Sequence, residues 1–463
     1  MYIHSAILLS AVHPGRLTLY SRILHVRLKI LIPISQLMTN YCNRRIREVL
    51  CGAAAVLLCA GAFSCGKEND ESQGGDAPHE GRARTVLVYM IGDVNLWQEQ
   101  WTNLNRLEAG WNDDIDGNLL VYLDPSPHTT QFPNPVLLEI VPDQTDAIVS
   151  RVVKSYPEQN ATDKAVMRGV LEDAIRMYPA PSQGLVIASG WWPAFADELV
   201  PTDDEHDTPQ TRAIAGGDRY GTDVEVNDLA ELLPIKYDFI LMHACLMGNV
   251  ETAYALKDKC GMYVASSATL PGASLPFQYI TEAMFAQPAA DFYHLIQTSC
   301  AFYNTLPEDE ADLLTLSAVR TDRLDGLATA TRALMEKVTA DPELFYDKLK
   351  DRAYTYEDSP YQDLRQVLAL ESEGVPELQS DYEAFCKALA DAVVLTGDVY
   401  QTLPPDMRLH PDDFCGLTCY TPQPDVKMSE LNAYFKKTYR WADASGFGLL
   451  VGYQGTPETT PVP

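Results

Sequence analysis

Cys245, which directly follows the apolar run 238–244 (DFILMHA), is the residue best placed for covalent chemistry. Such a run is typical of a strand buried on both faces of a parallel sheet. A helix-like segment begins a few residues later, so the thiol would lie at the carboxyl edge of the sheet, where α/β folds place ligands and catalysis. The helix N-terminus would favour a thiolate nucleophile. The alternative is that Cys245 is a small apolar core residue.

A thiol nucleophile needs a base, and His243 is the one among nine histidines that is adjacent to the thiol in sequence. Residues i and i+2 of a strand share a face, so His243 and Cys245 could be neighbours. Their Cβ atoms would be roughly 6–7 Å apart, which is long for a direct hydrogen bond. His206, in the acidic loop 203–207, could also approach the site. The competing interpretations are a packed strand histidine and a solvated loop histidine.

Apolar strand-like runs alternate with helical patterns along the first half of the chain. The expected strands are 85–91, 118–124, 136–141, 184–189, 237–243 and 262–266. Four helices are expected in this half. The first covers 96–109, and the second begins at the N-cap Thr162 and ends at about residue 178. The third is short and is capped by Asn227, and the fourth covers 249–258. We therefore predict an α/β fold with a mostly parallel sheet, in which strands 184–189 and 237–243 are adjacent.

The second half is predicted to be largely helical, with helices at 289–303, 323–339 and 382–396 and a late strand at 416–420. We expect it to form helical cover and added strands on the same body. The domain hypothesis is a sheet-containing domain at 85–285 and a helical C-terminal part at 286–463.

The N-terminal segment has the charge pattern of a secretory signal. Arg44, Arg45 and Arg47 precede the uncharged stretch 49–63, which is too short to span a bilayer comfortably. Ser64-Cys65 then resembles a bacterial lipobox, which predicts Cys65 as the lipid anchor; the alternative is an uncleaved apolar helix. Translation is expected to start at Met38. Residues 1–64 would then consist of an over-extended N-terminus followed by the signal peptide, and residues 65–84 would form a flexible tether.

Composition excludes several other classes of protein. The net charge of -29 argues against nucleic acid and against a basic patch on anionic lipid, so membrane contact is expected through the lipid anchor only. The expected location is the bacterial envelope, on the outer membrane, periplasmic or surface-exposed. The acidic loop 197–207 could bind Ca²⁺, but its spacing does not match an EF-hand, so we predict no metal and no cofactor. Cys415 and Cys419 are too far apart along one strand for a disulfide.

The run DFILMHACLMG at 238–248 resembles the nucleophile strand of the clostripain family of cysteine peptidases, which usually reads Asp-Ala-Cys-Leu-Met-Gly. Weaker similarities follow in the family order at 85–96, 118–124, 264–277 and 416–422, and together they cover roughly 85–277 and part of the C-terminal half. The resemblance implies a caspase-like three-layer fold and Cys245 as the nucleophile. It also implies a substrate-binding role for one set of residues, namely Asp93, Ser189, Gly190, Trp191, Ser266 and Ser267.

The resemblance fails at the catalytic histidine. The family places it after a strand similar to Leu-Ile-Leu-Trp-Ser-His-Gly, whereas 185–193 reads LVIASGWWP, with Ser189 followed by Gly190. Family members that prefer Arg or Lys have an acid in the pocket loop, and 268–280 has neither Asp nor Glu, so that specificity is not expected. Trp191 would line an apolar groove or act as a structural plug.

Two functions remain open, both with a peptide or protein as the partner. One is an active cysteine endopeptidase that uses Cys245 with a displaced histidine such as His243. The other is a pseudopeptidase, a lipoprotein that binds peptide without cleaving it. A peptidase whose nucleophile lacks its base loses most of its catalytic rate, so the sequence favours lost or reduced proteolysis.

Overall fold

The computed structural model describes residues 81–91, 97–125, 131–189, 224–270, 274–307, 313–350, 352–353, 360–400 and 414–454. The chain divides into two compact units, Met1–Gly75 and Asp76–Pro463, and every described residue lies in the second. The predicted signal segment therefore lies outside the described residues, as does nearly all of the tether.

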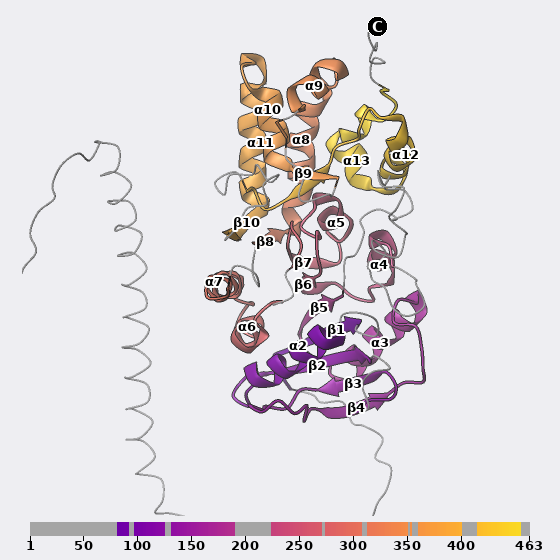
Figure 1. Ribbon diagram of the computed structural model, residues 1–463, viewed down its shortest axis with the longest axis vertical. Coiled ribbons are helices and arrows are strands. Elements are labelled where there is room, and N and C mark those ends of the chain that lie inside the picture. The colour runs from indigo at the N-terminus through magenta and orange to yellow at the C-terminus, as the bar shows by residue number, and fades with distance from the viewer. Residues whose placement is uncertain are drawn as a thin grey trace, which may run out of the picture. The chain divides into compact units, whose positions relative to one another are not determined.

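A nine-stranded sheet forms the centre of the described unit, in the order β10-β8-β7-β6-β5-β1-β2-β3-β4 (Figure 1). The central strands β7, β6, β5, β1 and β2 are parallel, and both ends of the sheet are antiparallel. The strands are β1 (Arg84–Ile91), β2 (Gly117–Asp124), β3 (Val136–Glu139), β4 (Arg151–Ser155), β5 (Ser182–Ala188), β6 (Tyr237–His243), β7 (Cys260–Ala265), β8 (Leu313–Arg320) and β10 (Val393–Tyr400). The predicted mostly parallel sheet is confirmed, and so is the adjacency of β5 and β6.

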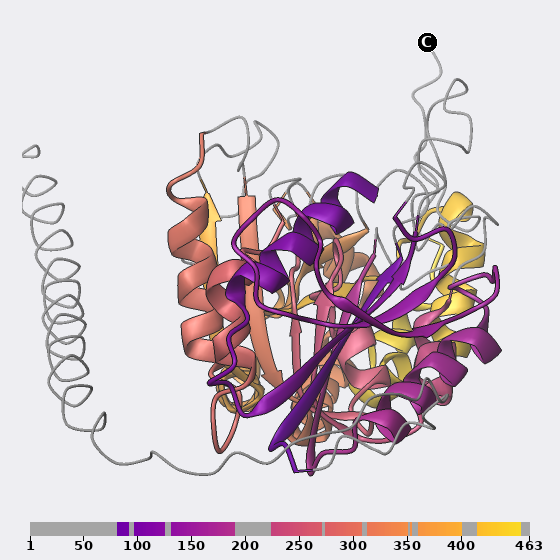
Figure 2. The same ribbon diagram turned by 90° about the horizontal axis from the view of Figure 1, so that it is seen from below.

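Helices cover both faces of the sheet, which gives three layers (Figure 2). One face carries α2 (Trp97–Gly110), α6 (Phe277–Met284) and α7 (Phe292–Tyr303), and the other carries α3 (Lys164–Met177), α4 (Val226–Leu232) and α5 (Val250–Ala255). Side chains alternate between the two layers along β6: Phe239 and Leu241 join the first core, Ile240 and Met242 the second. Burial on both sides explains why this strand is an unbroken apolar run.

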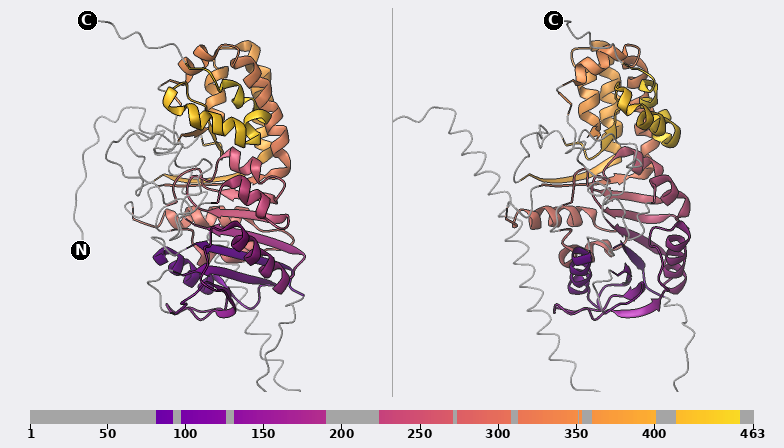
Figure 3. Two further views of the ribbon diagram at one scale, coloured as in Figure 1. Left: turned by 90° about the vertical axis from the view of Figure 1, so that its right-hand side faces the viewer. Right: turned by 45° about the vertical axis from the view of Figure 1, so that its right-hand side comes forward.

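The C-terminal half adds a group of helices beyond the β10 end of the sheet (Figure 3). They are α8 (Leu324–Val338), α9 (Pro342–Leu349), α10 (Leu364–Ser372), α11 (Gln379–Ala392), α12 (Ser429–Thr438) and α13 (Arg440–Ser445), with the 3₁₀ turns η3 (Thr321–Arg323), η4 (Pro376–Leu378), η6 (Val426–Met428) and η7 (Phe447–Leu450). This half also supplies β8 and β10 to the main sheet, and a two-stranded sheet of β9 (Tyr361–Asp363) and β11 (Thr418–Tyr420). The two halves therefore share one central sheet.

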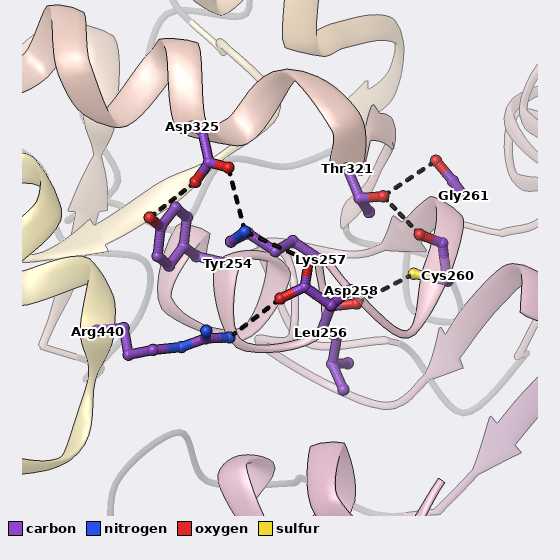
Figure 4. A network of polar contacts seen from close by, with 9 residues as sticks. All are labelled: Tyr254, Leu256, Lys257, Asp258, Cys260, Gly261, Thr321, Asp325 and Arg440. Atoms are coloured by element: carbon purple, nitrogen blue, oxygen red, sulfur yellow. Dashed lines mark hydrogen bonds and ion pairs between the residues drawn. The ribbon is translucent and has the colours of Figure 1, made fainter. Parts of the chain in front are cut away.

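A polar network joins the end of α5 to α8 and α13 (Figure 4). Asp325 of α8 accepts hydrogen bonds from Tyr254 Oη at 2.9 Å and Lys257 Nζ at 3.1 Å. Buried Thr321 donates its hydroxyl to the carbonyl oxygen of Cys260 at 2.5 Å. The carboxylates of Asp258 and Asp325 in these ion pairs are exposed to solvent, so each pair contributes about 1 kcal/mol or less. Buried apolar side chains of the same elements, among them Leu327 and Trp441, form part of the core beneath them.

Three local predictions are wrong in detail. Asp163, not Thr162, caps α3, because its carboxylate accepts from Ala165 N and Val166 N while the Thr162 hydroxyl turns to Asn160. Asn227 lies inside α4 and donates to Thr438 O at 3.2 Å. The helix expected to reach residue 396 ends at Ala392, because the β-branched residues that follow pair with β8 instead.

Every helix in the described part of the chain is too short or too polar to cross a membrane. The same residues contain no group of three or more His, Cys, Asp or Glu side chains arranged to hold a metal ion. The acidic loop 197–207 lies outside the described residues. Cys415 and Cys419 are buried free cysteines.

Candidate active site

The turn between β6 and α5 presents Cys245. Leu246 has φ 59°, a left-handed conformation that costs a residue with a Cβ about 1–2 kcal/mol. Three hydrogen bonds hold the turn: Leu246 N donates to Ala268 O at 3.1 Å, Gly248 N donates to Ser266 O at 2.6 Å, and Asn249 Nδ2 donates to Leu246 O at 2.9 Å. The loop after β7 therefore continues the β6–β7 pairing and fixes the position of the thiol.

Gly248 is required by the close approach of that loop. A Cβ at this position would lie 2.5 Å from Ser267 Oγ and 2.6 Å from Ser267 N, distances that real Cβ atoms do not adopt. The Gly248 carbonyl oxygen also accepts from Thr418 N of β11 at 2.9 Å. The C-terminal half thereby supports the turn from behind.

Cys245 is a free cysteine of intermediate burial, and its thiol faces the same loop. Leu270 N donates to Cys245 Sγ at 3.3 Å, and the thiol lies 3.9 Å from the Leu270 carbonyl oxygen. A backbone N–H directed at sulfur stabilises the anion. The Leu270 N–H is therefore a fixed donor to the thiol.

His243 is buried in the layer of α6, with its ring edge-on to Phe277 at 5.3 Å between centroids. Its Nε2 lies 2.5 Å from Ser274 Oγ and 3.4 Å from Leu275 N. Because a backbone N–H can only donate, Nε2 is an acceptor and the ring proton lies on Nδ1, which has no hydrogen-bond partner. Burial, with the positive charge of Arg106 second, lowers the pKa of His243 to about 4, so the ring is neutral near pH 7.

This environment does not suit a general base. The acceptor nitrogen of His243 already receives two hydrogen bonds, and the lowered pKa of the ring disfavours transfer of a proton to it from a thiol. His294 is the other described histidine; it is exposed on α7, with Nε2 3.5 Å from Thr298 Oγ1. Among the described residues, neither imidazole is hydrogen-bonded to Cys245.

The structure brings Ser189, Ser266 and Ser267 to the carboxyl edge beside this turn. Ser189 N donates to His243 O at 3.3 Å, and its buried hydroxyl has no hydrogen-bond partner. The Ser266 and Ser267 hydroxyls donate inward, to Ala268 O at 2.9 Å and Gly248 O at 3.0 Å. Both serines hold the loop against the turn, and their contact with a ligand stays a prediction.

Four predicted residues lie outside the described part of the chain: Asp93, Gly190, Trp191 and Cys65. The candidate base His206 also lies outside it. The structure makes no statement about these positions.

Sequence reasoning missed two residues that shape the site. Ser274 has φ 58°, and its carbonyl oxygen accepts from Tyr303 Oη at 3.1 Å while its hydroxyl meets His243. Tyr303 is on α7, far away in sequence, and the Cys245 thiol is among the groups that raise its pKa, after burial. The apolar stretch 292–303 signalled a helix, but not which residue would reach the loop.

Comparison with known proteins agrees with the fold described above. A model of the clostripain family matches residues 88–401. An inactive zymogen C11 protease from Parabacteroides distasonis aligns at 24% identity and TM-score 0.61, covering 79% of this chain and 99% of that one. A secreted C11 cysteine protease from Bacteroides thetaiotaomicron, in complex with an irreversible peptide inhibitor, aligns at 24% identity and TM-score 0.61, covering 78% and 98%.

A further structure, of a secreted C11 cysteine protease from Bacteroides thetaiotaomicron called iotapain, aligns at 20% identity and TM-score 0.61, covering 80% of this chain and 99% of that one. No curated protein matches the chain. These structural likenesses confirm the predicted caspase-like fold.

Proposed function

Because the chain belongs to the clostripain family of cysteine peptidases, we propose that it is a peptide-binding homologue in which proteolysis is lost or much reduced. One observation carries the proposal: His243, adjacent to the nucleophile in sequence, is buried, neutral and bonded through Nε2 to Ser274 and Leu275. The family histidine expected after Ser189 is absent from the sequence, either because Gly190 replaces it or because a short deletion removed it. A thiol without a base is mostly protonated near neutral pH and has no acid to protonate the leaving amine.

Peptide is the ligand class that the site best supports. The thiol is at the carboxyl edge of a parallel sheet, where open α/β folds bind their ligands. The Bacteroides thetaiotaomicron protease of the same fold was solved with a peptide inhibitor, which supports the same class of ligand here. The sequence 268–280, with no Asp or Glu, argues against a preference for Arg or Lys side chains.

Binding and turnover by the full chain separate this proposal from its alternative. Fluorescein-labelled peptide pools should raise fluorescence polarisation on binding, and quenched peptide pools should show the same negligible turnover with the wild type and with Cys245→Ala. Robust turnover that Cys245→Ala abolishes would overturn the proposal.

An active cysteine endopeptidase is the second candidate, favoured by the intermediate burial of Cys245 and its Leu270 N–H donor at 3.3 Å. In that case the base must be a group other than His243 in its present environment, or His243 must exchange its partners. Single substitution of each remaining histidine in the turnover assay would identify it.

We also propose that Cys65 is acylated and anchors the chain in the bacterial envelope, periplasmic or surface-exposed. The basic, apolar and Ser-Cys order of 44–65 supports this, and related proteases are described as secreted. Labelling of cells with a radioactive fatty acid should tag the wild type, and equal labelling of Cys65→Ala would defeat the proposal.

A further inference from the structure

A cavity of about 160 Å³ lies between α2 and the loop that faces the thiol. It is lined by Gln98, Glu99, Thr102, Asn103 and Arg106 of α2 and by Ser274. Ser274 contacts His243, two residues before Cys245, and it follows the loop whose Leu270 N–H meets Cys245 Sγ. A volume of this size holds several water molecules, which makes it large enough for a polar side chain.

Asn103 is the most informative residue of the cavity. Asn103 is 1% exposed, and neither its Oδ1 nor its Nδ2 has a hydrogen-bond partner among the described residues. A buried amide left without partners costs about 1–3 kcal/mol for each group, so native proteins rarely keep one without a reason. The next residues of α2 do not share this feature: buried Leu104 is apolar, and Asn105 Nδ2 donates to Thr145 O at 2.8 Å. A ligand that offers both an acceptor and a donor would satisfy Asn103.

The charges around Asn103 restrict that ligand further. Glu99, Asn103 and Arg106 recur at spacings of four and three, so they lie on one face of α2. Glu99 Oε2 is buried without a hydrogen-bond partner, while the Arg106 guanidinium lies 5.8 Å from the Phe302 ring centroid. His243 behind Ser274 is neutral. The lining therefore has one acidic side chain, Glu99, and one basic side chain, Arg106, with the neutral amide of Asn103 between them.

The side chains of a bound peptide differ in how well they fit the charges and hydrogen-bonding groups that line the cavity. A carboxylate would face Glu99, an ammonium or guanidinium would face Arg106, and an apolar group would leave the Asn103 amide unpaired. A carboxamide is neutral, its oxygen accepts from Asn103 Nδ2 or Arg106, and its N–H groups donate to Asn103 Oδ1 or Glu99.

We propose that this cavity is a specificity subsite for a carboxamide side chain, glutamine or asparagine, of the peptide bound beside Cys245. The proposal rests on the peptide-binding function above and adds its side-chain preference. Asn103 is the residue that decides the preference, and Glu99 and Arg106 set the charge that the subsite accepts.

Positional peptide pools test the preference on the full chain. Labelled hexapeptide pools have one position fixed as Gln, Asn, Glu, Lys or Leu and the others randomised, and each position is fixed in turn. At one position, the Gln or Asn pool should bind on the order of tenfold more tightly than the Glu, Lys and Leu pools by fluorescence polarisation. Equal or tighter binding of the Glu, Lys or Leu pools at every position would overturn the subsite while leaving peptide binding intact. Absence of binding by every pool would overturn the proposed function as well.

Substitutions in α2 assign the preference to the cavity. Asn103→Leu keeps the branched shape of the side chain and removes the amide, so the Gln and Leu pools should bind equally. Asn105→Leu on the same helix is the matched control and should keep the Gln preference. Glu99→Gln should shift the preference toward the Glu pool, a result that a purely structural role would not produce, and it serves as the test if Asn103→Leu does not fold. A Gln preference unchanged in Asn103→Leu, or in Glu99→Gln, would overturn the assignment.

Discussion

Ser274 Oγ lies 2.5 Å from His243 Nε2, and its hydroxyl donates a hydrogen bond to that nitrogen. Ser274 adopts φ 58°, a conformation that costs about 1–3 kcal/mol in a residue with a side chain, and Tyr303 Oη holds its carbonyl oxygen. The histidine beside the nucleophile thus serves as an acceptor that helps to pin a strained loop. This use of the ring competes with any use as a base.

Substitution of His243 is expected to leave the reactivity of Cys245 almost unchanged. His243→Gln keeps an acceptor for Ser274 and removes the imidazole, so iodoacetamide should alkylate Cys245 within about twofold of the wild-type rate between pH 6 and 9. Peptide-level mass spectrometry would distinguish Cys245 from the other free cysteines. His294→Gln, an exposed change on α7, is the control. A tenfold slower reaction, equivalent to about one unit of thiol pKa, would identify His243 as the base.

Stability should depend on pH through His243. Its pKa is about 4 in the folded chain, against about 6.5 when unfolded, so the unfolded chain takes up the proton first. This group's contribution to the free energy of unfolding is therefore complete above pH 6.5 and is lost as the pH falls toward 4. Urea unfolding at pH 7 and pH 4.5 should show a loss in the wild type that is larger than in His243→Gln, by up to about 3 kcal/mol. Equal losses would mean that the ring is already protonated or solvated.

Glu251 in α5 should make the stability of the folded chain fall as the pH rises, which is opposite to the effect of His243. It is 1% exposed, its Oε1 accepts from Tyr420 N at 2.9 Å, and burial raises its pKa to about 8. The folded chain retains this proton above pH 4.5, so stability falls as the pH rises from there toward 8. Glu251→Gln keeps the acceptor without the charge, and its melting temperature should exceed that of the wild type by several degrees at pH 8.5 but not at pH 5. Exposed Glu231→Gln should change neither value, and a pH-independent effect of Glu251→Gln would contradict the ionisation.

Gly248→Ala should damage the turn that presents the thiol. The added Cβ would lie 2.5 Å from Ser267 Oγ and 2.6 Å from Ser267 N, so the loop must move, at a cost of about 1–3 kcal/mol. Gly169→Ala in α3 is the matched control, because its Cβ meets nothing within 4 Å and alanine favours a helix by about 0.5–1 kcal/mol. Chemical denaturation should therefore show opposite signs for the two variants. A neutral Gly248→Ala would mean that the loop is not held as tightly as these contacts imply.

The amino-acid pattern alone was sufficient to predict the central sheet and the place of Cys245 after strand β6. Apolar runs at β1, β5 and β6 are buried on both faces, and such runs have few alternatives to a central parallel strand. The edge strands β4 and β10 were missed, because edge strands carry a weaker signal. The strand β8, which pairs with both β7 and β10, was not identified either. Helix caps were assigned to the wrong neighbour where two polar residues compete, as at Thr162 and Asp163.

The roles of side chains at the site were decided only by the tertiary structure. Strand alternation places His243 on the same face as Cys245. It does not predict that Ser274 and Leu275, which are 31 and 32 residues away in the sequence, are hydrogen-bonded to the Nε2 atom of His243. The unpaired Asn103 amide is likewise an unremarkable helix residue in the sequence. Hydrogen-bond partners and burial depend on which distant segments pack together. Those contacts set the pKa of His243 and the polarity of the cavity. The periodicity of a sequence reports only the local conformation and the face that each residue occupies.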